Sequence, residues 1–324
     1  MQKLNFDKAQ TNQTKYEYDF FKDGVTQSLI QTFLRCPRQC KLAYVDGWEV
    51  NKKANYFAFG DCAHYMLENI LKHGKLPTRL LIDQYLDKWF EKNSQDGGDV
   101  YELNEIMVQV KAIMEVYFMK YCTDIFKKWY ALELEFEVPY TYKDGLTIPL
   151  RGKIDMIETL EDGSLALYDT KTTSSWSKEH TLLLLPVDFQ LNFYLYVLSL
   201  QENISAVYYN VIKKPTHKRG KLDDDGFYDK LKNAYSEDLD KYFIRELVPI
   251  NSQSVGLWKE EFLDPIMLQM RTWAESKYEY PGYYNPLALE NKYGLTSFAR
   301  MLLFDTEAGY HKKEKVNPEL GDLK

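Results

Sequence analysis

Cysteine and long apolar runs are both scarce in this chain of 324 residues. The four cysteines, Cys36, Cys40, Cys62 and Cys122, all lie in the first half. So few cysteines favour reduced, structural thiols over a disulfide framework. Cys36 and Cys40 are spaced for one face of a helix, but no second CxxC pair or histidine pair completes a zinc site.

No stretch reaches the roughly 20 apolar residues of a membrane-spanning helix, and the first twenty residues lack the apolar centre of a signal peptide. We therefore expect a cytoplasmic protein with no membrane partner. The Walker A pattern GxxxxGK[ST] is absent as well. Any ATP-driven step would consequently have to come from a partner protein.

The composition that is present supports a folded domain. Hydrophobic residues make up 45% of the chain and aromatic residues 15%, which is ample for a packed core. The formal net charge of −7 argues against a large nonspecific coat of nucleic acid, although a local basic groove is compatible with it. We find no internal repeat, no low-complexity tract and no clear linker.

Residues 147–173 are the stretch around which the chain is organised. They predict two adjacent strands, with Glu161, Asp162 and Gly163 at the turn. Because strand side chains alternate, the apolar face of the second strand ends in Asp169 and Lys171.

Burying an unpaired carboxylate is costly, so Asp169 at the end of an apolar strand requires a counter-charge or a metal ion. Asp155 lies on the preceding strand and can come beside it. Two carboxylates that converge near Lys171 would form a site for a hard divalent cation with a cationic group at its edge.

Helices are expected before residues 147–173, and also before and after a further strand over 204–212. Thr26 or Ser28 can cap a helix that is interrupted near Cys36 and Pro37. His64 lies at the edge of the apolar stripe of the next helix, and this position alone favours a packed, hydrogen-bonded histidine. The other expected elements are helices over 56–72, 79–93, 101–129, 187–200, 227–247 and 256–278, and strands from 132 and over 204–212.

For two polar features the sequence alone does not decide between a structural and a functional explanation. Residues 213–221 are the densest basic cluster, explained equally well by a solvated loop or by a loop that contacts phosphates. Glu133 and Glu135 alternate with apolar residues, and either an exposed strand face or acids behind a metal site would explain them.

Five short motifs occur in order along the chain: SLIQTFLRCPRQCKLAYVDG at 28–47, FGDCAHYML at 59–67, RGKID at 151–155, YDTK at 168–171 and QLNFY at 190–194. Their order resembles that of the RecB-like exonuclease branch of the PD-(D/E)XK nuclease superfamily. Each motif is weak alone, whereas five in this order and context are specific. Together they span more than half of the chain.

The resemblance implies an α/β fold with a restriction-endonuclease-like core, in which a mixed central β-sheet is flanked by helices, with helical N-terminal and C-terminal additions. We accordingly expect a flexible arm over 1–24, a single nuclease domain over 25–310 and a charged tail over 311–324. Within the domain, the expected parts are a helical part over 25–130, a catalytic core over 131–213 and a C-terminal helical part over 222–310.

The resemblance also assigns roles to single residues. Asp155, Asp169, Lys171, Gln190 and Tyr194 become catalytic candidates. His64 becomes a metal ligand together with Asp155, Asp169 and the backbone carbonyl of Thr170. One or two Mg²⁺ or Mn²⁺ ions are implied as cofactors, and an imidazole ligand favours Mn²⁺. The candidate nucleic-acid contacts are Arg35, Arg38, Lys213, Lys214, Lys218 and Arg219.

The chain departs from the resemblance in one respect. Many members of that branch bind an iron–sulfur cluster through one early and three late cysteines, but here no cysteine follows Cys122. Residues 283–305 are similar to the late segment with its cysteines replaced. We therefore expect no iron–sulfur cluster, and we expect apolar packing through Leu295, Phe298 and Leu302 in its place.

The implied activity is that of a Mg²⁺- or Mn²⁺-dependent deoxyribonuclease in DNA replication, recombination or repair, which acts as an exonuclease rather than an endonuclease and is encoded by a phage. The implied partners are DNA ends and a helicase or recombination protein. The alternative is a catalytically silent DNA-binding or scaffolding subunit of a helicase–nuclease complex. The intact set of Asp155, Asp169 and Lys171 argues against that alternative.

Overall fold

The computed structural model describes residues 16–51, 55–95, 98–250, 252–291, 294–304, 306–317 and 320. The chain forms two compact units, which we call the terminal unit (residues 1–52, 139–150 and 268–324) and the core unit (residues 53–138 and 151–267). The division into arm, domain and tail stays a prediction. Residues 1–15 of the arm, and 318–319 and 321–324 of the tail, lie outside the described residues.

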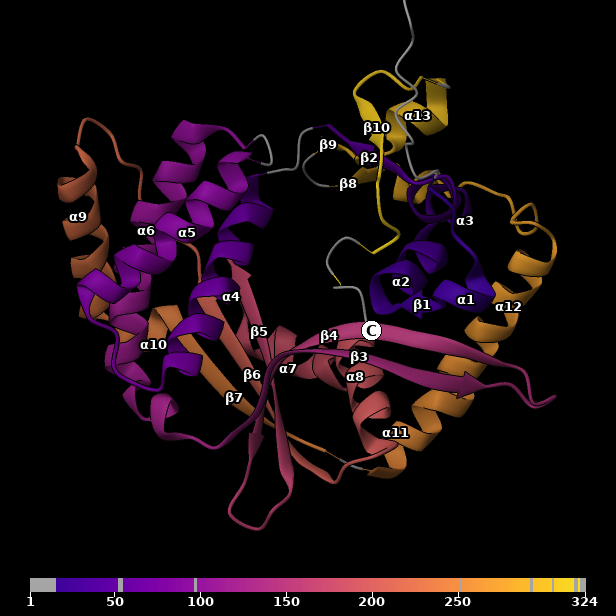
Figure 1. Ribbon diagram of the computed structural model, residues 1–324, viewed down its shortest axis with the longest axis horizontal. Helices are drawn as coiled ribbons and strands as arrows, with labels where there is room; N and C mark the ends of the chain where they lie inside the picture. The colour runs from indigo at the N-terminus through magenta and orange to yellow at the C-terminus, as the bar shows by residue number, and fades with distance from the viewer. Residues whose placement is uncertain are drawn as a thin grey trace, which may run out of the picture. The chain divides into compact units, whose positions relative to one another are not determined.

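A mixed β-sheet of six strands organises the fold (Figure 1). Its strands are β1 (Val25–Thr26), β3 (Trp129–Thr141), β4 (Thr147–Thr159), β5 (Leu165–Thr173), β6 (Ile204–Lys213) and β7 (Phe243–Pro249). The order is β1-β4-β5-β6-β7, and β3 also pairs with β4. The β5–β6 pair is parallel, whereas β4–β5 and β6–β7 are antiparallel. The mixed sheet flanked by helices confirms the expected fold class.

The two central strands form as the sequence predicts. Strands β4 and β5 are joined through the predicted turn, where Gly163 adopts a positive φ of 83°. Glycine suits this position because it has no Cβ to clash in the left-handed region. On β5 the side chains of residues 165–170 are all buried, as expected for a strand that is covered on both faces.

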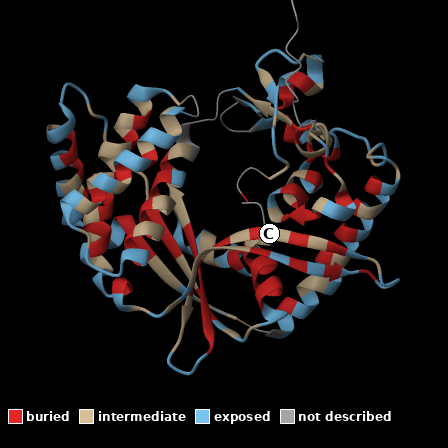
Figure 2. Cartoon of the chain, in the orientation of Figure 1, coloured by how far each residue is buried: buried red, intermediate tan, exposed pale blue. Residues whose placement is uncertain are grey.

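Helices of the core unit cover the sheet. The elements on one side are α4 (Asn55–His73), α5 (Arg79–Gln95), α6 (Val100–Lys120) and α9 (Asp224–Glu237). The main apolar cluster joins α4, α5 and α6 to strand residues such as Met156 and Tyr168. Buried residues line the inward sides of α6 and α9, and exposed residues their outward sides (Figure 2). Helices α7 (Lys178–Leu184) and α8 (Phe189–Ser199) form the crossover between β5 and β6.

Two of the predicted helices were too long. Helix α6 ends at Lys120 rather than continuing to 129, and a 3-10 turn over Cys122–Phe126 leads into β3. Asp124 in this turn forms a buried ion pair with Arg245, so a tertiary contact ends the helix without a glycine or proline signal. Helix α9 likewise ends at Glu237, and α10 (Leu239–Tyr242) precedes strand β7.

Strand β7 was wrongly predicted as helix because its amphipathic sequence fits either period over so few residues. Pairing with β6, from Ala206↔Pro249 to Ile212↔Phe243, decides the strand form. The predicted helix over 256–278 corresponds to α11 (Ser252–Trp258), a π-helical turn (Lys259–Leu263) and α12 (Asp264–Glu275). Among the described residues no single helix is long and apolar enough to span a membrane.

The terminal unit combines an early and a late segment of the chain. Its elements are α1 (Phe20–Asp23), α2 (Gln27–Arg35), α3 (Pro37–Cys40), a π-helical turn (Lys41–Val45), β2 (Trp48–Val50), η5 (Pro286–Ala288), β8 (Glu290–Asn291), β9 (Gly294–Leu295), α13 (Ala299–Phe304) and β10 (Tyr310–Lys312). Thr26 caps α2 by accepting a hydrogen bond from the backbone N–H of Leu29, as predicted. Strand β10 pairs with β2.

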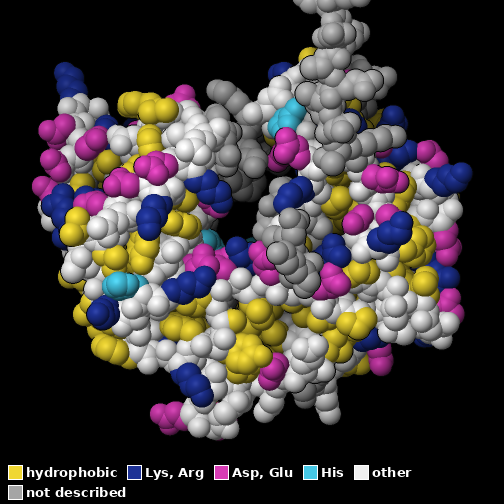
Figure 3. Space-filling model, viewed as in Figure 1, with side chains coloured by type: hydrophobic (Ala, Val, Ile, Leu, Met, Phe, Trp, Pro, Cys, Tyr) yellow, Lys and Arg dark blue, Asp and Glu magenta, His cyan; other side chains and the backbone are white. Residues whose placement is uncertain are grey.

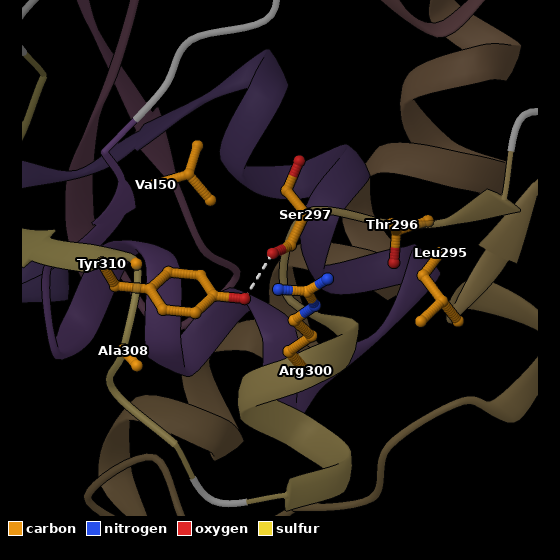
Figure 4. A pocket seen from close by; sticks show the side chains of 8 residues that line it. Val50, Leu295, Thr296, Ser297, Arg300, Ala308 and Tyr310 are labelled. Carbon is orange, nitrogen blue, oxygen red and sulfur yellow. Dashed lines mark hydrogen bonds between the residues drawn. The ribbon is translucent and has the colours of Figure 1, made fainter.

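The late segment does pack against the early one. Phe298, Met301 and Ala43 are buried in a cluster that Leu302 flanks, whereas Leu295 is exposed. The Cys36 Sγ accepts a hydrogen bond from the backbone N–H of Asn285 at 3.4 Å. A nearby cavity of about 490 Å³ is lined by Val50, Leu295, Thr296, Ser297, Arg300, Ala308, Gly309 and Tyr310 (Figure 4).

Candidate active site

Strands β4 and β5 separate where the candidate site begins. Their paired residues run from Thr159↔Leu165 to Met156↔Tyr168. Beyond the last pair, the backbone N–H of Thr170 on β5 donates a hydrogen bond of 2.8 Å to the side chain of Asp155, at Oδ2, and not to a backbone carbonyl of β4. A carboxylate that accepts a backbone N–H is fixed in orientation. Asp155 is therefore held against the end of β5.

A chain of hydrogen bonds fixes Lys171. Its Nζ donates to Asp169 Oδ1 at 2.9 Å and to Gln190 Oε1 at 2.6 Å. The Gln190 amide in turn donates to Tyr194 Oη at 3.2 Å. Asp169 is only 2% exposed, whereas 31% of the Lys171 side chain is exposed. The ammonium group is thus anchored on its buried side and accessible on the other.

Two further ligand atoms converge beside Asp155. His64 Nδ1 on α4 lies 3.7 Å from Asp155 Oδ1 and 3.7 Å from Glu133 Oε1 on β3. Glu133 adopts a positive φ of 55°, which is rare for a residue other than glycine in a strand. Such strain costs on the order of 1–3 kcal/mol and concentrates at functional sites. Lys153 holds the other Glu133 oxygen at 2.7 Å.

The charges of the site perturb one another strongly. Burial lowers the pKa of His64, but Asp155 and Glu133 outweigh it and raise this pKa to about 9. Burial raises the pKa of Asp155, and the neighbouring Asp169 raises it further. Burial lowers the pKa of Lys171, but Asp169 and Asp155 reverse this effect and leave the pKa raised. At neutral pH the site without a bound cation therefore carries a protonated His64.

These donor atoms suit a divalent cation. His64, Glu133 and Asp155 each offer one ligand atom, and all three atoms lie within 4.8 Å of one another. A separation of 3.7 Å is too long for a hydrogen bond, yet ligands that share one ion at about 2.1–2.3 Å can have it. Imidazole and carboxylate groups are both common ligands of divalent metal ions. The predicted ligand Asp169 is not part of this group, and its Oδ1 instead accepts a hydrogen bond from Lys171.

A buried polar network supports Thr170 from behind. Asn210, with no exposed surface, donates to Thr170 Oγ1 at 3.3 Å and to Tyr117 Oη at 3.1 Å. Arg245 donates to Tyr117 Oη at 2.7 Å and binds both carboxylate oxygens of Asp124 at 2.7 and 2.9 Å. This network connects helix α6 and strands β6 and β7 to the strand that carries Asp169 and Lys171.

The predicted nucleic-acid contacts are divided between the two units. Arg35 and Arg38 are exposed in the terminal unit. In the core unit Arg219 pairs with Asp224 and lies 5.2 Å from the Phe227 ring, which is a structural role. Lys214 lies 5.3 Å from the Phe59 ring, Lys213 ends β6, and Lys218 is exposed. Acidic and basic side chains intersperse on the face shown in Figure 3.

Sequence reasoning left two parts of the site undecided or unseen. Glu133 and Glu135 were indistinguishable by pattern, and only the positive φ of Glu133 turns its carboxylate toward His64. The Asn210–Arg245 network was missed, since it joins residues far apart in the sequence. An asparagine inside the apolar run of β6 was the one available signal.

Comparisons with known proteins identify the family. The family model of the PD-(D/E)XK nuclease superfamily matches residues 25–294, so the chain belongs to this superfamily. Its nucleases generally use divalent metals, which agrees with the donor set described above. The solved structure of SSO0001 is similar at 15% identity, covering 66% of this chain and 85% of that one, with a TM-score of 0.27. A search of curated proteins finds no match.

Proposed function

We propose that the chain is a metal-dependent deoxyribonuclease of the RecB-like branch that acts as an exonuclease on DNA ends in replication, recombination or repair. The observation that carries this proposal is the bonding of Lys171 between Asp169 and Gln190, with Asp155 fixed beside them. A half-buried lysine that is held by two acceptors and has one accessible side suits a group that acts on a phosphate. A helicase or recombination protein is the proposed partner.

Each residue has a separate task in the proposed mechanism. His64, Glu133, Asp155, Asp169 and the Thr170 carbonyl would hold Mg²⁺ or Mn²⁺. When bound, the cation lowers the pKa of water and offsets charge on the phosphate. Lys171 orients the attacking water and stabilises negative charge that develops on the phosphate oxygens. Gln190 and Tyr194 are positioning residues that fix the Lys171 ammonium group.

The test compares the wild type with Lys171→Ala on end-labelled linear and circular DNA, single- and double-stranded, with Mg²⁺, Mn²⁺ or EDTA. We expect metal-dependent shortening of linear DNA by the wild type alone. Lys92→Ala, at an exposed lysine on α5, serves as the matched control and should cut like the wild type. Circular dichroism verifies that all three proteins fold.

The same experiment separates the alternatives. Cutting of circular DNA would replace the exonuclease by an endonuclease. Binding of DNA without cutting under any metal would favour the silent scaffolding subunit and overturn the catalytic assignments. The described side chains favour catalysis, because a scaffold has no need to hold a lysine beside two acids.

A further inference from the structure

A second cavity of the core unit, about 810 Å³ in volume, lies along β7 and has no part in the proposed chemistry. Strand β7 is the last strand in the order of the sheet. The lining residues are Lys120, Tyr121, Trp176, Lys178, Tyr208, Lys213, Asp240, Lys241 and residues 243–247. We refer to this cavity as the β7 pocket.

The β7 pocket adjoins the end of the strand that carries Lys171. Lys213 is paired with Thr173 in the β5–β6 register, so its side chain lies on the same sheet face as that of Lys171. Strand spacings place the Cα atoms of Lys171 and Lys213 about 8 Å apart. Trp176 follows Thr173 by three residues and also lines the pocket. A polymer bound at Lys171 could therefore extend into the pocket.

The lining combines positive charge with aromatic rings. Five cationic residues face two carboxylates, in a chain whose net charge is −7. Lys120 pairs with Asp240 and Lys178 with Glu246. Lys213 and Lys241 form no ion pair with any residue that the structure describes, and their charges are available to an anion.

Three half-buried rings complete the lining: Trp176, Tyr121 and Tyr208. Tyr208 is paired with Tyr168, so its side chain lies on the opposite face of the sheet from that of Lys171, and Trp176 is the ring that follows the Lys171 strand. Arg245 stacks on Tyr121, with the guanidinium carbon 3.9 Å from the ring centroid, and this contact fixes one wall. Aromatic faces beside lysines are the combination that proteins use to bind single-stranded nucleic acid, since rings stack on bases and lysines neutralise phosphates.

We propose that the β7 pocket binds one unpaired strand of the nucleic-acid substrate, next to the nucleotides that are cleaved. Lys213 and Lys241 contact the phosphates, and Trp176 stacks on a base. The proposal rests on the proposed nuclease function and specifies its substrate as a strand with an unpaired segment.

An extended acidic peptide that adds to the edge of β7 is the competing occupant. The structure disfavours it at the start of the strand. The Phe243 carbonyl already accepts hydrogen bonds from the Lys120 ammonium and from Tyr121 Oη at 3.3 Å. A peptide strand would have to displace both donors, whereas a nucleic-acid strand needs only the side chains.

The experiment measures binding of fluorescent oligothymidylate by anisotropy, in EDTA and at several salt concentrations. The variants are Lys213→Ala/Lys241→Ala, Trp176→Ala and Trp176→Phe. The matched controls are Lys75→Ala/Lys92→Ala and Tyr101→Ala, which alter exposed residues of the core unit away from the pocket. Hydrolysis of a nitrophenyl ester of thymidine monophosphate reports the chemistry separately, because so small a substrate does not reach the pocket.

We expect the double lysine variant to bind at least about tenfold more weakly, with the slope of log K against log salt reduced by about 1.4, or roughly 0.7 for each lost phosphate contact. Trp176→Ala should lose about 5- to 100-fold in affinity, while Trp176→Phe retains most of the affinity because it keeps a ring. Hydrolysis of the small ester and the affinity of the control variants should not change.

Unchanged oligonucleotide binding by the double lysine variant and by Trp176→Ala would overturn the proposal. So would binding of an acidic peptide in place of the oligonucleotide, since this result would assign the pocket to a protein partner. A failure of the proposed function would look different. The wild type would then hydrolyse neither DNA nor the small ester, while the pocket variants would still bind DNA more weakly than the wild type.

Discussion

Asp155 Oδ2 accepts a hydrogen bond of 2.8 Å from the backbone N–H of Thr170, at the point where β4 separates from β5. One side chain thus takes over a bond of the strand ladder and turns its other oxygen toward His64. The carboxylate both terminates the pairing of the strands and offers a ligand atom.

Asp155→Asn should separate these two tasks. An asparagine oxygen can still accept the Thr170 N–H, whereas its charge is lost. Because the pKa of Asp155 is raised in the folded protein, its ionised form is unfavourable there, and the variant should melt no lower than the wild type in EDTA at pH 7. Mg²⁺ or Mn²⁺ at about 100 times Kd stabilises the wild type by about 2.7 kcal/mol, and the variant should lose this gain.

The measurement is thermal unfolding of both proteins with and without metal, monitored by circular dichroism. A variant that still gains stability from metal would show that Asp155 is no ligand. Asp162→Asn, at an exposed turn, is the control and should respond to metal like the wild type.

Gln190→Ala should lower kcat by about 10- to 100-fold, since Lys171 loses the acceptor that fixes its ammonium group. KM should change little, because Gln190 has no proposed contact with the substrate. Single-turnover and steady-state assays on linear DNA measure both constants. Gln201→Ala, at an exposed position beyond α8, is the control. A tenfold rise in KM with unchanged kcat would instead make Gln190 a binding residue.

His64 should make the stability of the metal-free protein depend on pH. Its pKa is raised from 6.5 to about 9 by Asp155 and Glu133 against the effect of burial. A raised folded pKa contributes stability that is fully present below pH 6.5 and is lost as the pH rises through about 9. The melting temperature in EDTA should therefore fall between pH 6.5 and 9 in the wild type, and less in His64→Gln.

The comparison is made with melting curves of both proteins at pH 6, 7, 8 and 9. If the melting temperature fell equally steeply with pH in both proteins, His64 would not carry the proposed charge in the metal-free protein. Bound metal should remove the difference, because a ligating imidazole must be neutral and releases its proton on binding.

Arg245→Met should destabilise the protein by about 3–5 kcal/mol, because it leaves the buried carboxylate of Asp124 with only the Lys127 ammonium, 3.6 Å away, to offset its charge. Urea unfolding measures this loss. The double variant Arg245→Met/Asp124→Leu should regain most of it, since no unpaired charge remains. Arg271→Met is the control, because Arg271 forms exposed pairs that contribute little. Equal losses in the single and double variants would contradict this account.

The sequence by itself determined the central strands, the turn at Gly163, the helix that carries Gln190 and the acids at the end of an apolar strand. These features follow from local rules, namely alternation, capping and turn chemistry. The order of five motifs added the family: the match to the family model confirms the PD-(D/E)XK nuclease superfamily, whereas the RecB-like branch stays a prediction.

Only the tertiary structure decided the rest. The end of α6 at Lys120 depends on an ion pair between Asp124 and Arg245, 121 residues apart. Strand β7 forms because β6 offers it a partner, since its own pattern fits either period. Glu133 faces His64 because its backbone adopts a conformation that the sequence does not favour. In each case contacts between distant residues outweigh local preference.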